Sequence, residues 1–371
     1  MGLEELPEHL IAEIFGHLSW LGDLYSASLV CHKWHSCFYN PTIWRNLDIY
    51  ITEGVNNRQL TETVNRFGHY AQSFGLYVNQ EDECNRKLAI EILCALSKKE
   101  DGRLQSLVVE FTGENPLFYA GTEFVDAVME IFRNTEIAQL RHVDLHALHV
   151  KLTDDFLYLL SHKHSAFLQY LDLQNQQMIC LLTPHCLLHV ISVCTQLLHL
   201  RIYYASCSDD CLRAIAAPGR VPLKSLSLLC SAQDKYRGDI ERFDQVDLTD
   251  EAWADLKRGV PDIRVSLKIT HRCPVRRIRE ILRPAIPLWS LYMEAYTVAY
   301  VEVQIAADCY GDSLEHFKLI TPMSENLEKS LRNLVELCPN LKSLYVLAPV
   351  TPETVQTIMG QNPNLEFAVI K

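Results

Sequence analysis

Apolar and polar residues follow two different spacings along this chain of 371 residues. From residue 6 to residue 18, apolar residues recur at steps of one, three and four, which is typical of a helix with one apolar face. The members of this face are Leu6, Leu10, Ile11, Ile14, Phe15 and Leu18. Pro7 suits a first helical turn, where its missing N–H costs nothing, and Glu8 favours the positive end of the helix. The pattern therefore predicts an amphipathic helix at the start of the chain.

Three shorter helical elements are predicted after a break at Gly22 and Asp23. The second helix would carry Leu24, Ala27, Ser28 and Val30, the third would span Cys31–Tyr39 with Trp34 and Phe38, and a short turn would present Ile43, Trp44 and Leu47. A helical unit of about 45 residues buries too little apolar surface to be stable alone. We therefore expect it either to cap the adjacent domain or to bind a partner.

From residue 71 onward the apolar spacing changes to a strand-like pattern, L-x-x-L-x-L or a close variant. The pattern starts at residues 71, 104, 140, 168, 197, 223, 262, 288, 314, 341 and 365. Most of these starts are 24 to 29 residues apart, which agrees with the period of leucine-rich repeats. The starts before residue 140 are more widely and less regularly spaced.

Signals for the start of a helix stand between these strand patterns. A Ser or Thr precedes Pro or an acidic residue at Thr153, Thr183, Ser208, Thr249 and Thr351. Such side chains cap the free amides of a first helical turn. Strands and helices that alternate at this period predict an α/β solenoid with a curved parallel sheet inside and helices outside.

The order of residues at the N-terminus resembles the F-box, a short helical module of cullin–RING ubiquitin ligase receptors. The resemblance covers residues 4 to 47 and rests on Leu6-Pro7, Ile14-Phe15, Leu18, Asp23-Leu24, Val30-Cys31-x-x-Trp34 and Trp44. The Ser19–Gly22 link is about one residue longer than is usual in the module. Cys194 and Cys338-Pro339, each just before a repeat strand, resemble the cysteine-containing repeats of F-box receptors. The chain as a whole is thus similar to F-box and leucine-rich-repeat proteins.

This resemblance divides the chain into an F-box at residues 1–48 and a leucine-rich-repeat domain at residues 49–371. The first repeats, to about residue 139, are irregular, and those at 140–371 are regular. A polar insertion at about 231–250 is interpreted either as a tolerated exposed loop or as a loop that grips a substrate.

The resemblance implies the substrate-recognition subunit of an SCF ubiquitin ligase, with no catalysis and no cofactor of its own. The F-box would bind the Skp adaptor, and through it the cullin and the RING subunit, while the repeats hold an unknown protein substrate. The implied adaptor contacts are Leu6, Pro7, Leu10, Ile14, Phe15, Leu18, Leu24, Val30 and Trp34. A repeat scaffold without any ligase coupling stays open as an alternative.

Side chains at the third, fifth and seventh positions of each strand pattern are expected on the concave sheet face, because side chains alternate along a strand. The residues favoured there for substrate binding are His142, Asp144, Tyr170, Asp172, His199, Arg201, Tyr203 and Tyr292. Tyr, His and Arg are enriched where proteins bind one another. The other interpretation of each residue is an ordinary solvated sheet face.

Charge and composition exclude several other classes. A net charge of −12 disfavours nucleic acid and anionic membrane as partners, and no apolar run is long enough to span a bilayer. Thirteen cysteines without C-x-x-C pairs favour reduced thiols in the cytoplasm or nucleus. His185 and His189 lack the Glu of a zinc-protease motif, so no metal site is predicted. No cysteine stands out as an activated nucleophile.

Overall fold

The computed structural model describes residues 6–18, 20–52, 57–99, 102–115, 121–134, 138–175, 180–231 and 247–369. It comprises two compact units, Met1–Leu171 and Asp172–Lys371. Ser19 and most of the predicted polar insertion at 231–250 lie outside the described residues. The F-box and repeat boundaries predicted at residues 48 and 49 stay a prediction.

The first unit begins with the predicted helices. They are α1 (Glu8–Gly16), α2 (Leu21–Ser28), α3 (His32–Phe38) and the short 3₁₀ turn η2 (Ile43–Arg45). Ile11 and Phe15 of α1 are fully buried, and Trp44 of η2 is 1% exposed. The amphipathic spacing of the N-terminal residues therefore does produce a small helical core.

This helical core packs on the first strand–helix unit behind it. The ring of Trp44 stacks on Phe67 with the centroids 4.0 Å apart, and Trp44 Nε1 donates a hydrogen bond of 2.9 Å to the carbonyl of Phe38. Phe67 ends helix α4 (Asn57–Phe67). The packing supplies the additional buried surface that so small a helical unit needs.

The rest of the first unit alternates strands and helices. Its elements are β1 (Asn46–Ile51), α4, η3 (Gly68–Tyr70), β2 (Ser73–Asn79), α5 (Glu83–Ser97), β3 (Leu104–Thr112), α6 (Thr122–Arg133), β4 (Ala138–Asp144) and α7 (Asp154–His164). Each strand pairs in parallel with the next along the chain from β1 to β4. Leu47, Phe74, Leu107 and Val143 lie at matching register positions, and all are buried. Strand β5 (Tyr170–Asp172) stands at the boundary of the two units.

The second unit repeats the same design. Its elements are α8 (Pro184–Val193), β6 (His199–Tyr203), η4 (Tyr204–Ser206), α9 (Asp209–Ala216), β7 (Ser225–Cys230), α10 (Asp250–Gly259), β8 (Arg264–Ile269), α11 (Val275–Ile281), β9 (Leu288–Glu294), α12 (Tyr300–Tyr310), β10 (His316–Ile320), α13 (Glu325–Leu337), β11 (Ser343–Leu347), α14 (Pro352–Gln361) and β12 (Glu366–Val369). Strands β6 to β12 pair in parallel in chain order.

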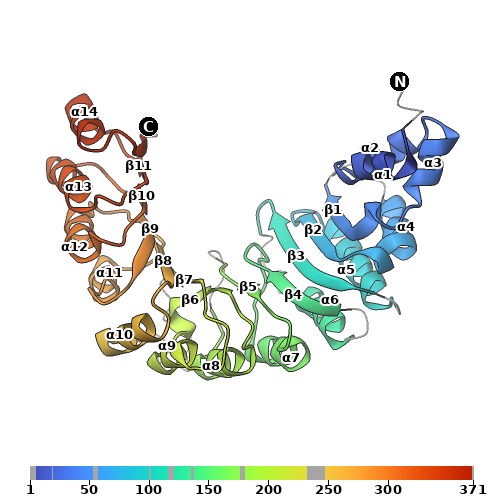
Figure 1. Cartoon of the computed structure of the whole chain (residues 1–371), viewed down its shortest axis with the longest axis horizontal. Coiled ribbons are helices and arrows are strands. Elements are labelled where there is room, and N and C mark those ends of the chain that lie inside the picture. The colour runs from blue at the N-terminus through green and yellow to red at the C-terminus, as the bar shows by residue number, and fades with distance from the viewer. Residues whose placement is uncertain are drawn as a thin grey trace. The chain divides into compact units, whose positions relative to one another are not determined.

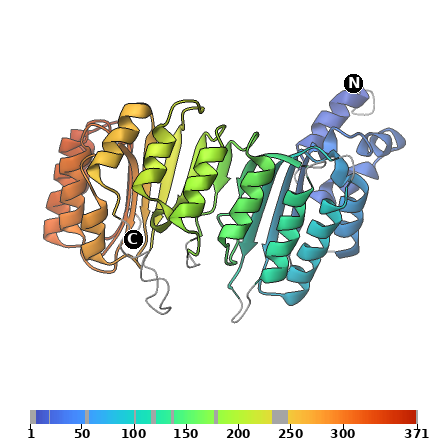
Figure 2. The same ribbon diagram turned by 90° about the horizontal axis from the view of Figure 1, so that it is seen from below.

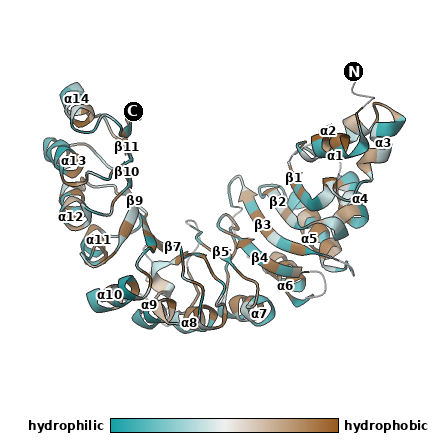
Figure 3. Ribbon diagram, in the orientation of Figure 1, coloured by the Kyte–Doolittle hydropathy of each residue, from teal (hydrophilic) through white to brown (hydrophobic). Residues whose placement is uncertain are grey.

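In each unit the strands line one side and the helices the other (Figures 1 and 2). Figure 3 colours much of α10 and α14 hydrophilic, as expected for helices with one side open to water. Along β6, the buried Leu200 and Ile202 alternate with the half-buried His199 and Arg201, so that one sheet face is more accessible than the other. The predicted α/β repeat architecture is therefore confirmed.

The predicted helix caps are mostly present. The side-chain oxygens of Thr183, Ser208, Thr249 and Thr351 each accept a hydrogen bond from a backbone amide in the first turn of their helix. Thr153 precedes α7 as predicted, but its side chain makes no such bond. Among the described residues, no helix combines the length and the apolar character needed to cross a membrane.

Candidate functional site

Exposed apolar side chains gather on the N-terminal helices. Eleven large apolar residues are exposed in the described part of the chain, and six of them lie between residues 10 and 39. Leu10 and Ile14 of α1 are 37% and 40% exposed, while Leu29 and Val30, between α2 and α3, are 80% and 62% exposed. We call these four residues the N-terminal apolar surface. A group of large apolar side chains exposed to water is typical of a surface that binds another protein.

The adaptor contacts implied by the sequence divide into exposed and buried residues. Leu10, Ile14 and Val30 belong to the N-terminal apolar surface. Pro7 is also exposed, and Leu6, Leu18 and Trp34 are half-buried. Phe15 and Leu24 are 0% and 6% exposed.

Phe15 and Leu24 therefore support the surface from beneath in the free chain. The ring of Phe15 meets the edge of Trp34 with centroids 5.4 Å apart. Leu29, the most exposed of the large apolar residues that the structure describes, was missed because the helical spacing assigned it to no apolar face. The sequence feature that could have pointed to Leu29 is its position next to Val30, an implied adaptor contact.

On the sheet face of the first unit, the His142 ring stacks on Tyr170 with centroids 4.2 Å apart and planes 15° apart. His142 Nδ1 lies 3.2 Å from the hydroxyl of Ser106 on the preceding strand. In the structure, these two residues, which were predicted on the sheet face, are thus in direct contact. A stacked pair of flat rings offers contact area with polar edges.

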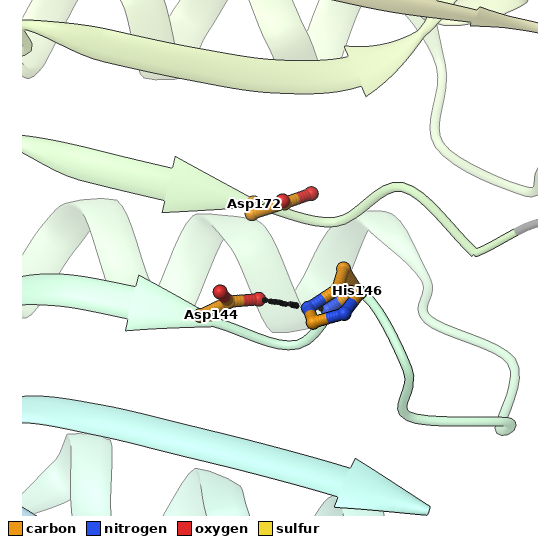
Figure 4. A group of neighbouring side chains, drawn as sticks. All are labelled: Asp144, His146 and Asp172. Carbon is orange, nitrogen blue, oxygen red and sulfur yellow. Dashed lines mark hydrogen bonds and ion pairs between the residues drawn. The ribbon is translucent and has the colours of Figure 1, made fainter. Parts of the chain in front are cut away.

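Asp144, at the end of β4, holds the neighbouring His146. Its Oδ1 accepts the backbone N–H of His146 at 3.1 Å and lies 2.6 Å from the ring Nδ1, the contact dashed in Figure 4. Burial raises the pKa of Asp144, but the hydrogen bonds from His146 outweigh it and leave the pKa below its usual value. His149 instead meets Gln80 at 2.7 Å. The closely spaced histidines 142, 146 and 149 therefore take separate partners.

On the sheet face of the second unit, Arg201 forms an ion pair with Asp172 at 2.7 Å. His199 Nδ1 lies 2.8 Å from the hydroxyl of Ser225. Tyr203 is 8% exposed, and its hydroxyl bonds both the N–H and the carbonyl of Asn175 at 3.1 Å. Asp172 and Tyr203 thus hold the local backbone and side chains and present little surface to a partner, whereas Arg201 and His199 remain accessible.

Further along the same face, lysine and tyrosine alternate across four adjacent strands. Lys268, Tyr292, Lys318 and Tyr345 occupy matching register positions on β8, β9, β10 and β11. We call this set the Lys–Tyr row. Lys268 Nζ lies 5.6 Å and Lys318 Nζ 5.3 Å from the centroid of the Tyr292 ring, within the range of a cation–π interaction.

Burial lowers the pKa of Lys268, and the positive charges of Arg201 and Lys318 lower it further, against the opposite effect of Asp172 and Glu294. Burial and the neighbouring Glu294 raise the pKa of Tyr292. Lys268 was missed in the sequence analysis, because the proposed face passed over the repeats that start at 223 and 262. The alternation of polar and apolar residues in DIRVSLKI (262–269) would have placed Lys268 on the same sheet face.

One pair of cysteines in the second unit has an altered acidity. All thirteen are free thiols. A hydrogen bond from Cys207 lowers the pKa of Cys211 to about 7, but both residues are 0% exposed. A thiol that no substrate can reach does not act as a catalytic group. Cys207 and Cys211 are therefore part of the buried core of the second unit.

The N-terminal helices match a known protein family. The sequence model of the F-box-like family matches residues 3–50, the segment that carries the N-terminal apolar surface. The N-terminal segment is an F-box-like domain. Domains of this kind generally bind the Skp adaptor.

Relatives extend the similarity to the repeats behind the F-box-like domain. The chain is 29% identical over 371 residues to F-box/LRR-repeat protein 8 of Homo sapiens, covering 99% of this chain and 95% of that protein. It is 28% identical to the Bos taurus protein of the same name, with the same coverage. It is also 28% identical to the Mus musculus protein, covering 100% of this chain and 95% of the other. The resemblance to F-box and leucine-rich-repeat proteins is therefore confirmed.

Such proteins generally serve substrate recognition in SCF ubiquitin ligases and act as adaptors, not as catalysts. Among solved structures, a leucine-rich-repeat protein of Legionella pneumophila, LegL7, superposes with a TM-score of 0.43 and 14% identity. The superposition covers 86% of this chain and 97% of that protein.

Proposed function

We propose that this protein is the substrate-recognition subunit of an SCF ubiquitin ligase. The observation that supports the proposal is an F-box-like domain with apolar side chains in water, joined to strand–helix repeats with an open sheet face. The F-box-like domain binds the Skp adaptor, which links it to the cullin and the RING subunit. The repeats hold the target protein for ubiquitination and proteasomal degradation.

The N-terminal apolar surface supplies the adaptor interface. Burying apolar surface contributes about 25 cal/mol per Å², and Leu10, Ile14, Leu29 and Val30 are apolar side chains exposed to water. The buried Phe15 and Leu24 fix the helices that carry these residues. The packing of Trp44 on Phe67 then connects the adaptor-binding helices to the repeats of the same unit.

The sheet faces supply the target interface. They present aromatic rings, histidines and paired charges on strands whose backbone is fixed by the ladder, and a rigid face loses little entropy when it binds. The chain itself carries out no catalysis and needs no cofactor. It works in the cytoplasm, the nucleus or both, where its thirteen thiols stay reduced.

The test is purification of the tagged full-length chain from cells, with detection of cullin and RING subunit. We expect both to co-purify with the natural sequence and to be lost when Leu10→Glu is combined with Ile14→Glu. Leu337→Glu on α13 is the matched control, because Leu337 is 42% exposed and lies far along the sequence from the F-box-like domain.

Two outcomes would contradict the proposal. Absence of cullin from the purified natural chain would favour a repeat scaffold without ligase coupling. Transfer of ubiquitin by the purified chain, with no cullin or RING subunit present, would show it to be an enzyme. The circular dichroism spectrum of each variant confirms that the helices and strands persist.

A further inference from the structure

We propose that a pocket at one edge of the second unit binds a basic segment of a partner protein and takes up an arginine or lysine side chain of that segment. The pocket lies where strands β8, β9 and β10 begin and where helices α10, α12 and α13 end. It belongs neither to the F-box-like domain nor to the sheet face, and its role is therefore independent of the proposed function.

The pocket is a hollow of about 920 Å³ lined by residues between Lys257 and Leu337, and we call it the strand-start pocket. Its volume lies within the range of sites that take a ligand. The turns 261–263, 284–287 and 311–313, each just before a strand, supply much of the lining. Helices α12 and α13 lie side by side (Figure 1), and a Cβ on Gly311 would lie 2.6 Å from the carbonyl oxygen of Leu337. The ends of these two helices are thus in close backbone contact, which fixes this part of the lining.

Negative charge prevails in the strand-start pocket. Its lining contains four carboxylates and two cations, which are Asp262, Asp308, Asp312 and Glu315, and Lys257 and Arg264. Glu315 pairs with Lys342 at 2.6 Å, and Arg264 lies over the ring of Trp289. Within the described part of the second unit, the three aspartates form no ion pair, and all three are exposed. The pocket therefore offers uncompensated negative charge to a ligand.

The helix ends add to this negative charge. A helix carries the negative end of its dipole at the C-terminus, where basic side chains are favoured. Helix α10 follows this rule, with Lys257 and Arg258 in its last turn, but α12 and α13 have no basic residue there. Asp308 instead stands in the last turn of α12, where it accepts only a neutral hydrogen bond among those of the described residues, from Gln304 at 2.8 Å. A bound cation removes this electrostatic conflict, so charge complementarity identifies the occupant as cationic.

The apolar part of the lining favours a long side chain of a protein over a small cation. It consists of Leu337, which is 42% exposed, the ring of Trp289 and the prolines at 261, 284 and 287. Lysine and arginine bury their methylene stems on such surfaces while the charged end reaches a polar group. The hollow is larger than one side chain, so the neighbouring residues of an extended segment fill the rest of it.

The experiment measures the fluorescence anisotropy of short labelled peptides during titration with the purified full-length chain. The peptides share Gly and Ser flanks and carry arginine, glutamine or glutamate at the same central positions. We expect the arginine peptide to bind at least about 10-fold more tightly than the other two. Asp308→Asn with Asp312→Asn should weaken its binding at least about 10-fold. This variant should fold, because Asp308→Asn removes a charge that is unfavourable at the end of α12. Leu337→Ala, which changes no charge, should weaken binding about threefold through loss of the apolar wall.

The matched control is Glu251→Gln with Glu353→Gln. It removes the same charge from exposed positions in the first turns of α10 and α14 and should leave the affinity for the arginine peptide within about twofold. Equal binding of the arginine and glutamine peptides would overturn the inference, and so would an equal loss of affinity in the control. Spermidine that displaces the arginine peptide at an equal concentration would also overturn it, in favour of a free polyamine as the ligand.

Discussion

Arg201 Nε lies 2.7 Å from Oδ2 of Asp172, a carboxylate whose side chain is only 2% exposed. The N–H of Nε is not aligned for a hydrogen bond, so the contact is an ion pair. The other oxygen of Asp172 accepts the backbone N–H of Gln174 at 3.0 Å. Arg201, which was predicted to bind the substrate, is thus a cation that compensates the buried negative charge of Asp172.

We therefore expect Arg201→Ala to destabilise the chain by about 2–4 kcal/mol, because it removes the ion pair that the buried carboxylate of Asp172 forms with Arg201. The double variant Arg201→Met with Asp172→Asn should recover most of this loss. Free energies of unfolding in urea measure both. Equal stability of Arg201→Ala and the natural chain would show that Asp172 has sufficient compensation without the arginine.

His164 in α7 should make the first unit sensitive to acid. The side chain is 1% exposed, and burial lowers its pKa to about 4, although a hydrogen bond to the carbonyl of Phe132 acts in the opposite direction. In the unfolded chain the pKa is about 6.5. The unfolded state therefore binds a proton below pH 6.5 while the folded state does not.

Stability from this histidine is complete above pH 6.5 and is lost progressively as the pH falls toward 4, by about 3 kcal/mol in total. His164→Gln removes the titrating group, so the variant should lose less stability than the natural chain between pH 7 and 4.5. Urea unfolding of both at each pH gives the comparison. Parallel curves for the two proteins would be the contradicting result.

Glu328 in α13 holds the start of the next helix, α14. One oxygen accepts the N–H of Thr351 at 2.9 Å, and the other accepts the hydroxyls of Thr351 and Thr354, each at 2.7 Å. Burial raises the pKa of Glu328, but these hydrogen bonds outweigh it, so the pKa is lowered. Their contribution is present at neutral pH and is lost as the pH falls below about 4.5.

Glu328→Gln should weaken this contact by about 1–2 kcal/mol, because an amide cannot accept through both ends. Hydrogen exchange of the α14 amides at neutral pH should then be faster. Glu325→Gln is the control, since it removes a charge from the exposed side of the same helix, where Glu325 pairs with Lys329 at 2.7 Å. Unchanged exchange in Glu328→Gln would refute the role.

Local patterns predicted the elements well where one physical rule decides the outcome. Leu and Val at alternating positions define the strands, and capping by Thr249 or Thr351 defines the helix starts. The sequence patterns predict no strand at Asn46–Ile51, where β1 lies, because Leu47 is assigned to the last turn of the helical module and the first strand pattern starts at residue 71. The alternation of Leu47, Ile49 and Ile51 nevertheless marks it.

The sites were harder to predict, since they depend on which side chains meet. Spacing could not show that Phe15 turns inward while its neighbour Ile14 faces water. Nor could it show that Tyr203 would be bound to the backbone of Asn175. The Lys–Tyr row depends on the register of four strands separated by helices, a relation that single segments do not contain.

We expect the F-box-like domain to bind the Skp adaptor through the N-terminal apolar surface. Calorimetric titration of purified adaptor into the full-length chain measures this binding. We predict one adaptor per chain, a Kd of about 1 μM or lower and a negative heat-capacity change, the mark of buried apolar surface. Leu10→Glu with Ile14→Glu should weaken binding at least about 100-fold, and Leu337→Glu should not alter it. Absence of binding by the natural chain, or undiminished binding by the double variant, would contradict the account.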